Sequence, residues 1–169
     1  MVRAGERGRL FEDFMQHSIV AIDWDELGEL TNVTDADEVR RKVEDKYQNA
    51  KAGSKAMATS QVSRFRFDFK ENDYVITYSP KSRKYLVGTI KGPYYYDANR
   101  KEYRNVRKAD WKGTVSRDDL STPTRNTLGA TSTIFDTGKD AEKEVVDLLR
   151  NILAEIASLD WDVENTTDE

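Results

Sequence analysis

The first clear alternation of apolar and polar positions spans residues 19–24, where Val20, Ile22 and Trp24 share one face of a predicted strand. Carboxylates follow at once, so the indole of Trp24 would lie at the strand's end, where a core face opens toward a rim. Trp24 is therefore either the last core residue of the strand or part of a pocket wall. Before the strand, residues 10–15 have apolar positions at helical spacing and predict a short helix.

Two further segments in the first half of the chain have helical spacing. Residues 34–49 begin with Thr34 as a cap and with acids in the first turn, which predicts a helix. Residues 51–59 are expected to form a loop. Residues 60–69 fit a strand, because their phenylalanines alternate, or a helix. We favour the helix, because residues 70–73 read as a tight turn into the next strand.

Stretches rich in β-branched and aromatic residues predict an antiparallel sheet. The clearest hairpin joins residues 74–78 to residues 85–90. Further strands are expected at residues 94–96, 103–106, 109–115 and 131–135. Before the last of these, Ser116 and Ser121 are typical helix caps, and they predict two short helices in succession.

From residue 137 onward the sequence predicts a long amphipathic helix followed by an acidic end. Its apolar positions form a broad stripe on a helix of about 20 residues, and they are Val145, Leu148, Leu149, Ile152, Leu153, Ile156 and Leu159. Residues 160–169 are acidic and are expected to form a linker. The predicted fold is α+β: a small, strongly curved, mostly antiparallel β-barrel with flanking helices and a C-terminal amphipathic helix. We place one folded domain at residues 1–136 and the helix with its linker at residues 137–169.

Composition narrows the possible chemistry. The chain has 169 residues, of which 37% are hydrophobic and 34% charged, and its mean hydropathy is −0.79. It contains no long apolar run or signal peptide, and we expect a cytoplasmic protein that does not enter membranes. With no cysteine and one histidine, His17, it cannot form disulfides, thiolate metal sites or a relay of two imidazoles. We therefore predict no metal and no cofactor.

Charge is segregated along the chain. Residues 81–125 contain 12 Lys and Arg against 5 Asp and Glu, whereas residues 136–169 contain 3 against 11. Such blocks of opposite sign favour a basic surface that meets a polyanion and an acidic tail that does not. An exposed basic stretch can also be merely solvated, and the net charge of −4 is not typical of a nucleic-acid-binding protein.

Several of these segments, taken in order, resemble a known family. They are residues 22–28 (IDWDELG), 65–69, 72–78 (NDYVITY), 85–88 (YLVG), 106–111 (VRKADW) and 116–120 (SRDDL). This order is similar to the N-terminal module of Mrr-like restriction proteins, which is related to the EVE and YTH domains of the PUA-like superfamily. The resemblance covers residues 8–136 and implies a curved barrel with an aromatic pocket for a modified base. Asp23 and Asn72 stand where relatives often have glycine, and Asp23 could alter what the pocket accepts.

The resemblance implies that Trp24 and Tyr78, each ending a strand, converge on that pocket. Ser79, Ser60 and Gln61 could supply hydrogen bonds, and Asp23 could accept one from an exocyclic amine. Tyr78 can equally be an ordinary half-buried strand residue, and Ser60 and Gln61 can serve a helix cap. The expected contacts to the nucleic-acid backbone are Lys81, Arg83, Lys84, Arg117 and Arg125.

No catalytic residue is predicted. Mrr-type nuclease chemistry needs an acid and a Glu/Gln-x-Lys element on a strand, and the short matches in this chain fall on expected helices. We therefore expect a DNA-binding specificity module of a modification-dependent restriction system. It would recognise a methylated or hydroxymethylated base flipped out of double-stranded DNA, and a nuclease domain or subunit would do the cutting. Two alternatives remain: a PUA-like domain that binds modified RNA, and an assembly module that forms homo-oligomers through its C-terminal helix.

Overall fold

One long strand, β5 (Asn105–Ser116), organises the sheet in the computed structural model, which describes the backbone of residues 1–166 and the side chains of residues 1–161. The strand order is β1–β5–β3–β2, every pairing is antiparallel, and β4 also pairs with β5. The other strands are β1 (Ile19–Ile22), β2 (Tyr74–Ser79), β3 (Lys84–Ile90) and β4 (Tyr95–Tyr96).

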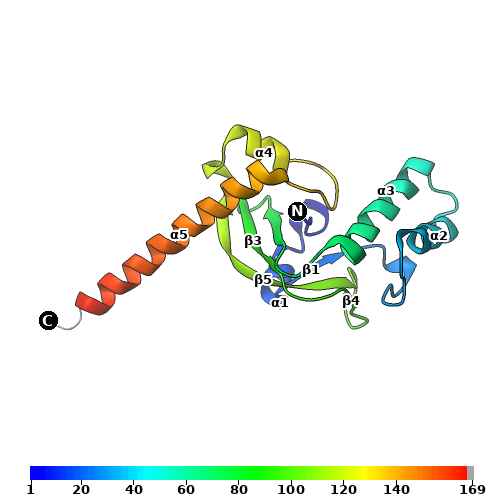
Figure 1. Cartoon of the computed structure of the whole chain (residues 1–169), viewed down its shortest axis with the longest axis horizontal. Helices are drawn as coiled ribbons and strands as arrows, with labels where there is room; N and C mark the ends of the chain where they lie inside the picture. The colour runs from blue at the N-terminus through cyan, green and yellow to red at the C-terminus, as the bar shows by residue number, and fades with distance from the viewer. Residues whose placement is uncertain (167–169) are drawn as a thin grey trace.

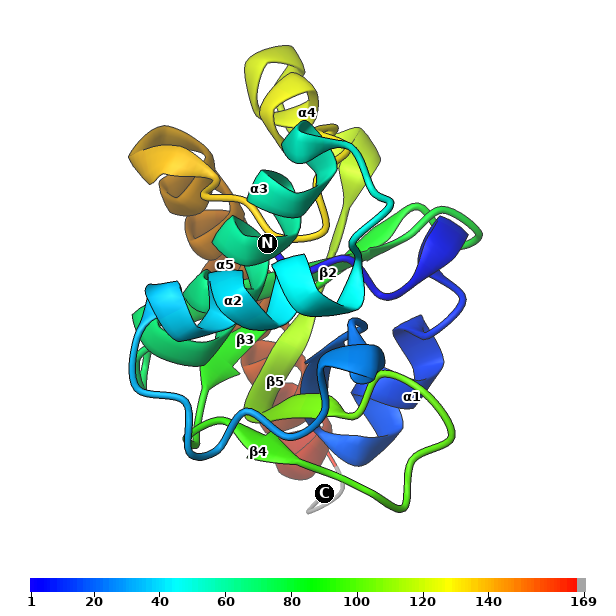
Figure 2. The same ribbon diagram turned by 90° about the vertical axis from the view of Figure 1, so that its right-hand side faces the viewer.

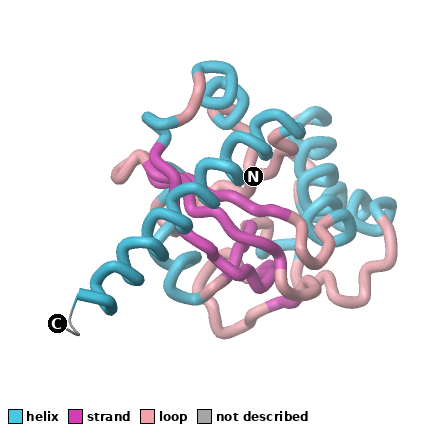
Figure 3. The backbone as a smooth tube through the Cα atoms, turned by 60° about the vertical axis from the view of Figure 1, so that its left-hand side comes forward, coloured by secondary structure: helices cyan, strands magenta, loops and turns pink. Residues whose placement is uncertain are grey.

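The sheet curls because β5 changes partners along its length. Its first four residues pair with β1, and the rest pair with β3. Farther along β5, a register shift between Val87 and Gly88 leaves Lys112 without a partner in β3, and a Cβ atom on Gly88 would come within 2.2 Å of the Asp110 carbonyl oxygen. Only glycine permits so close a backbone approach, and bulges of this kind bend a strand. The result is a curled half-barrel, which confirms the predicted α+β fold class (Figure 3).

Helices cover the two faces of this sheet (Figures 1 and 2). The main ones are α1 (Phe11–His17), α2 (Ala36–Lys46), α3 (Ala52–Ser63), α4 (Thr122–Leu128) and α5 (Gly138–Thr166). Short helical turns are η1 (Glu6–Gly8), η2 (Asp25–Leu27), the π-helical η3 (Arg64–Asp68) and η4 (Arg117–Asp119). One core lies between the sheet, α1, α2 and α3, and a smaller one lies beneath α4 and α5.

The first half of α5 is docked and its second half projects away from the body (Figure 1). Leu149 packs at Gly113 of β5, where a Cβ atom would lie 2.9 Å from the leucine Cδ1. Glu144 accepts hydrogen bonds from the backbone N–H and the hydroxyl of Ser121, the cap of α4, and these bonds hold the pKa of Glu144 below its usual range. No helix in the described part of the chain is long and apolar enough to cross a membrane.

The sheet is joined to the end of α3 by the buried side chain of Arg107. Its guanidinium donates to the carbonyl oxygens of Phe65 at 2.8 Å, Arg66 at 2.9 Å and Gly92 at 3.3 Å. Burial, assisted by the nearby Arg66, lowers the pKa of Arg107 to about 10, so it remains charged at neutral pH. Arg66 in turn donates to the carbonyl oxygens of Leu30 and Thr31. These two arginines fix η3 against the sheet and against the loop before α2.

The predicted strands need two corrections. Residues 103–106 and 109–115 are not separate strands, because β5 runs through both without a turn. Residues 131–135 do not form a strand: only Ile134 makes a bridge, with Val2, and its N–H donates to the Gln61 side chain at 3.0 Å. The hairpin of β2 and β3 is confirmed, as are the serine caps of η4 and α4.

The predicted helices also change at their ends. The loop expected at residues 51–59 is wrong, because α3 begins at Ala52. The helical interpretation of residues 60–69 is confirmed, because α3 and η3 together continue to Asp68. Asp35, rather than Thr34, caps α2 by accepting from the Glu38 N–H. The C-terminal helix has 29 residues and continues to Thr166, into the segment expected to be a linker. Residues 167–169 of that segment lie outside the described residues.

We expect Arg107→Met to lower the free energy of unfolding by about 3 kcal/mol, because the carbonyl groups of Phe65 and Arg66 lose charge-assisted hydrogen bonds in a buried site. Urea denaturation followed by circular dichroism measures the change. Lys108→Met, at the exposed next position of β5, is the matched control and should cost less than about 1 kcal/mol, since only an exposed contact with the Tyr95 ring is lost. Equal effects of the two substitutions would contradict this role of Arg107.

Candidate functional site

Three aromatic side chains from distant parts of the chain line one cavity of about 420 Å³. Trp24 comes from the N-terminal end of η2, Tyr47 from the C-terminal end of α2, and Tyr103 from the loop before β5. The other lining residues are Asp23, Glu26, Ala50, Ser54, Lys55, Met57, Ala58 and Thr133. We call this cavity the Trp24 pocket. Its volume lies within the range of about 300–1,000 Å³ that is usual for small-molecule sites.

Two of the aromatic residues have unusual backbone conformations. Trp24 has a φ of 67° and Tyr103 a φ of 52°, both in the left-handed region. For a bulky residue this conformation costs about 1–2 kcal/mol. It also means that Trp24 does not continue β1, which ends at Ile22, so the expected common strand face of Val20, Ile22 and Trp24 is wrong. Strain of this kind gathers at ligand sites, where the surrounding structure holds it in place.

A buried polar network holds the loop that carries Trp24. The Asn105 side chain, which is fully buried, donates to the Asp23 carbonyl oxygen at 3.1 Å. The Tyr94 hydroxyl donates to Asn105 Oδ1 at 2.7 Å and accepts from the Leu30 N–H at 3.1 Å. Both ends of the loop from Asp23 to Leu30 are therefore tied to the sheet, and the pocket wall is formed before any ligand arrives.

The lining of the Trp24 pocket contains two carboxylates, Asp23 and Glu26, against one lysine, Lys55, and Asp25 lies between the two carboxylates in the chain. Asp25 accepts from the Arg104 N–H at 2.8 Å, and burial raises its pKa despite that bond. The Tyr47 hydroxyl donates to Glu26 at 3.0 Å, and burial together with this carboxylate raises the pKa of Tyr47. Asp23 is exposed and makes only a long contact of 3.5 Å, to the Asp25 N–H. Asp23 therefore has accepting capacity left for a ligand.

Of the predicted pocket residues, Trp24 and Asp23 lie together and the other four lie elsewhere. Tyr78 is at the far end of β2 and packs with the second core, at a different cavity. Gln61 is buried and accepts from Ile134, and the Ser79 hydroxyl accepts from the Ser82 N–H at 3.3 Å, so both have structural partners. Ser60 lines a third cavity, between α2 and α3.

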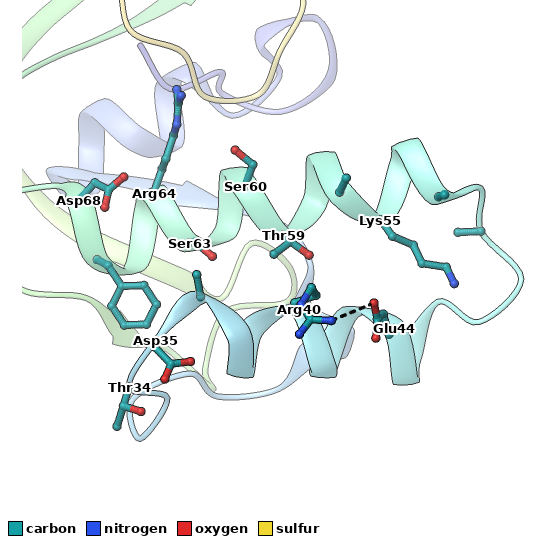
Figure 4. Close-up of a pocket in the computed structure, with 15 residues that line it drawn as sticks. Thr34, Asp35, Arg40, Glu44, Lys55, Thr59, Ser60, Ser63, Arg64 and Asp68 are labelled. Carbon is teal, nitrogen blue, oxygen red and sulfur yellow. Dashed lines mark ion pairs between the residues drawn. The ribbon is translucent and has the colours of Figure 1, made fainter.

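That third cavity, of about 1,050 Å³, is a groove lined mainly by small residues (Figure 4). Thr59 and Ser63 of α3 point toward α2, whereas Ser60 and Arg64 point away from it. Arg40 is paired with Glu44 at 3.5 Å, so its charge is already balanced within the groove. The groove lacks an aromatic platform apart from Phe67 and does not form the predicted site.

The basic residues predicted to contact phosphates are at the other end of the sheet from Trp24. Lys81, Arg83 and Lys84 surround the turn between β2 and β3, and Arg83 forms an ion pair with Asp118. This ion pair lowers the pKa of Asp118. Arg117 lines the cavity that also contains Tyr78, whereas Arg125 donates to Thr122 on the surface of α4.

Tyr47 and Tyr103 are the site residues that the sequence did not reveal. Both are far from Trp24 in the chain, and neither stands in a motif. Tyr47 caps the C-terminal end of α2, a helix on which Val39 and Val43 are the buried residues. Within the described residues, no three His, Cys, Asp or Glu side chains are grouped so that they could hold a metal ion.

A sequence model for the family described as Domain of unknown function (DUF8426) matches residues 2–137. The chain therefore belongs to this family, and the match covers the half-barrel, with the Trp24 pocket, but not the length of α5. Searches of curated proteins and of solved structures gave no match.

The strain at Trp24 can be measured by comparing two substitutions that both remove the indole. We expect Trp24→Gly to be more stable than Trp24→Ala by about 1 kcal/mol, because glycine adopts a positive φ without a steric penalty. Thermal or urea unfolding of the two proteins gives the difference. A position with ordinary backbone angles would show the reverse order, because glycine there adds flexibility to the unfolded chain.

Proposed function

We propose that this domain binds nucleic acid and reads a base that has been flipped into the Trp24 pocket. The observation that carries the proposal is the pair of aromatic residues, Trp24 and Tyr103, held in left-handed conformations at the wall of one cavity. A packing role alone gives no reason for such strain in two aromatic side chains. Flat apolar faces in a preformed cavity are what a flipped base needs for stacking.

The acidic groups favour a particular kind of base. A carboxylate accepts hydrogen bonds, so the free capacity of Asp23 suits an exocyclic amine, such as N4 of cytosine or N6 of adenine. An added methyl or hydroxymethyl group would lie against the aromatic walls. This chemistry supports a modified amino-bearing base as the ligand.

We further propose that the bound polymer is modified double-stranded DNA and that the domain supplies specificity to a modification-dependent restriction system. The support is the sequence resemblance to the N-terminal module of Mrr-like proteins, together with the curled sheet that the resemblance implied. In this proposal, cleavage belongs to a separate nuclease domain or subunit. The basic turn formed by Lys81, Arg83 and Lys84 would contact phosphates without reading the base.

The proposal predicts that Trp24→Ala loses its preference for modified DNA. Loss of one stacking face should remove about 1–3 kcal/mol from binding to the modified duplex and should leave binding to the unmodified duplex nearly unchanged. Fluorescence anisotropy at fixed salt measures both affinities. The duplexes carry one central 5-methylcytosine, 5-hydroxymethylcytosine, N6-methyladenine or unmodified base.

Two comparisons make this test specific. Tyr74→Ala removes an aromatic side chain at the start of β2, outside the Trp24 pocket, and should keep the preference of the wild-type protein. Single-stranded RNA with and without N6-methyladenosine tests the RNA-binding alternative. Preference for the modified RNA over every DNA duplex would reject DNA as the partner, and an unchanged preference in Trp24→Ala would reject the pocket.

The distal half of α5 supports a second candidate function, which is assembly. Leu153, Ile156 and Leu159 lie on one side of this half and are 41%, 50% and 63% exposed. Residues 151–166 contain four acids and no base, so pairing with a second copy of the same segment would bring like charges together. This charge favours a partner helix whose apolar stripe is flanked by Lys and Arg, rather than the homo-oligomer expected from the sequence.

This candidate predicts a charge-dependent interaction. A designed amphipathic peptide with Leu and Ile along one face and Lys beside it should bind at least about tenfold more tightly than the same peptide with Glu in place of Lys. Isothermal titration measures both, and Ile156→Asp should abolish the binding. Sedimentation velocity of the chain alone should show a monomer. A dimer that Ile156→Asp dissociates would instead identify a second copy as the partner.

A further inference from the structure

The Tyr78 cavity, of about 260 Å³, lies where three separate parts of the chain meet. The N-terminal segment forms one wall, the turn end of β2 and β3 forms another, and η4 with the end of α4 forms the third. The lining residues are Met1, Arg3, Ala4, Gly5, Gly8, Tyr78, Pro80, Tyr85, Arg117, Leu128, Gly129 and Ala130. We call it the Arg3–Arg117 cavity.

The charge of this cavity is opposite to that of the Trp24 pocket. Its lining includes two arginines, Arg3 and Arg117, and no aspartate or glutamate. Arg3 donates to the Thr131 carbonyl oxygen at 2.8 Å, and Arg117 hydrogen-bonds the Tyr85 hydroxyl and lies near Asp118, which is itself paired with Arg83. In the described part of the chain neither Arg3 nor Arg117 forms a direct ion pair, and arginines that line a concave site in this way are typical of binding sites for phosphates and carboxylates.

The walls of the cavity are closely packed. The rings of Tyr78 and Tyr85 are 4.6 Å apart with 31° between their planes, and Tyr85 is only 1% exposed. Gly5 and Gly8 both have φ near +70°, and a Cβ atom on Gly8 would lie 2.7 Å from the Pro80 ring. The N-terminal segment therefore fits closely against the turn after β2, and side chains larger than glycine would separate them.

The two cavities are close to each other along the backbone. Ala130 lines the Arg3–Arg117 cavity and Thr133 lines the Trp24 pocket, so the segment between them spans at most about 10 Å. The backbone N–H of Arg3 also donates to the Thr133 carbonyl oxygen at 2.8 Å, which fixes the N-terminal segment beside this connection. Arg117 and Trp24 themselves lie toward opposite ends of the sheet, so a B-form strand that contacts both cavities, at about 3.4 Å per nucleotide, must span more than the roughly three nucleotides that this segment alone would allow.

We propose that the Arg3–Arg117 cavity binds a phosphate group of the strand whose base enters the Trp24 pocket, several nucleotides from that base. The choice of a strand phosphate rests on the proposed nucleic-acid function. The charge and shape of the cavity also admit the phosphate of a free nucleotide. The cavity gives the bound strand a second fixed point and thereby its direction relative to the Trp24 pocket.

The experiment combines a protein substitution with neutral phosphates. Arg117→Ala should weaken binding to both modified and unmodified duplexes about tenfold and should make the slope of log affinity against log salt about 0.9 less steep. The matched control is Arg41→Ala, which removes the same charge from an exposed residue of α2 outside the cavity. Unchanged thermal melting of both variants shows that the fold is retained.

A set of duplexes then carries one methylphosphonate at each position near the modified base. One position several nucleotides from that base should weaken binding to the wild-type protein and have no further effect on Arg117→Ala. Equal losses for Arg117→Ala and Arg41→Ala, or no position coupled to Arg117, would reject the cavity as a strand contact. The two proposals can fail separately. If a neutral phosphate is coupled to Arg117 but the wild-type protein binds modified and unmodified duplexes equally, the cavity is supported and the base-reading function is rejected.

A final titration with adenosine monophosphate and with inorganic phosphate separates the two sources of phosphate. If the wild-type protein binds the mononucleotide but no duplex, and Arg117→Ala abolishes that binding, the cavity is assigned to a free nucleotide and the strand contact is rejected. If the mononucleotide, inorganic phosphate and the duplexes all fail to bind, the phosphate assignment itself is wrong.

Discussion

The buried charge of Arg107 is the constraint on which the arrangement of this fold depends. A guanidinium removed from water must find acceptors, and here it uses backbone carbonyl groups at the end of α3 instead of a carboxylate. Those carbonyl groups are available because the π-helical turn η3 departs from regular α-helical hydrogen bonding. The sheet therefore sets where α3 ends, and α3 in turn supplies Lys55, Met57 and Ala58 to the Trp24 pocket.

The same principle operates around the Trp24 loop. Asn105 begins β5, just two positions before Arg107, and it holds the backbone of Asp23. Two polar side chains near the start of β5 therefore position both the Trp24 loop and the end of α3, and this loop and α3 form two walls of the pocket. Buried contacts with the sheet already order the cavity walls, so ligand binding would cost little conformational entropy in the protein.

Local patterns in the sequence were enough to predict the hairpin of β2 and β3, the serine caps at Ser116 and Ser121, and the curled α+β fold. They failed where tertiary contacts override local preference. Gly53 and Ser54 disfavour a helix, yet packing on α2 keeps them in α3. At the site, the pattern singled out Trp24 and Asp23. The local pattern did not identify Tyr47 and Tyr103 as site residues, because they come close to Trp24 only in the folded chain.

The two halves of α5 differ in how their helical order is maintained. Starting a helix is unfavourable, whereas extending one adds a hydrogen bond for each residue fixed, so an isolated segment of about 14 residues is marginal in water. The docked half, held by Leu149 at Gly113 and by Glu144 at Ser121, acts as the nucleus for the projecting half. The distal apolar stripe is therefore presented in helical form before any partner arrives, and association there avoids most of the entropy loss of coupled folding.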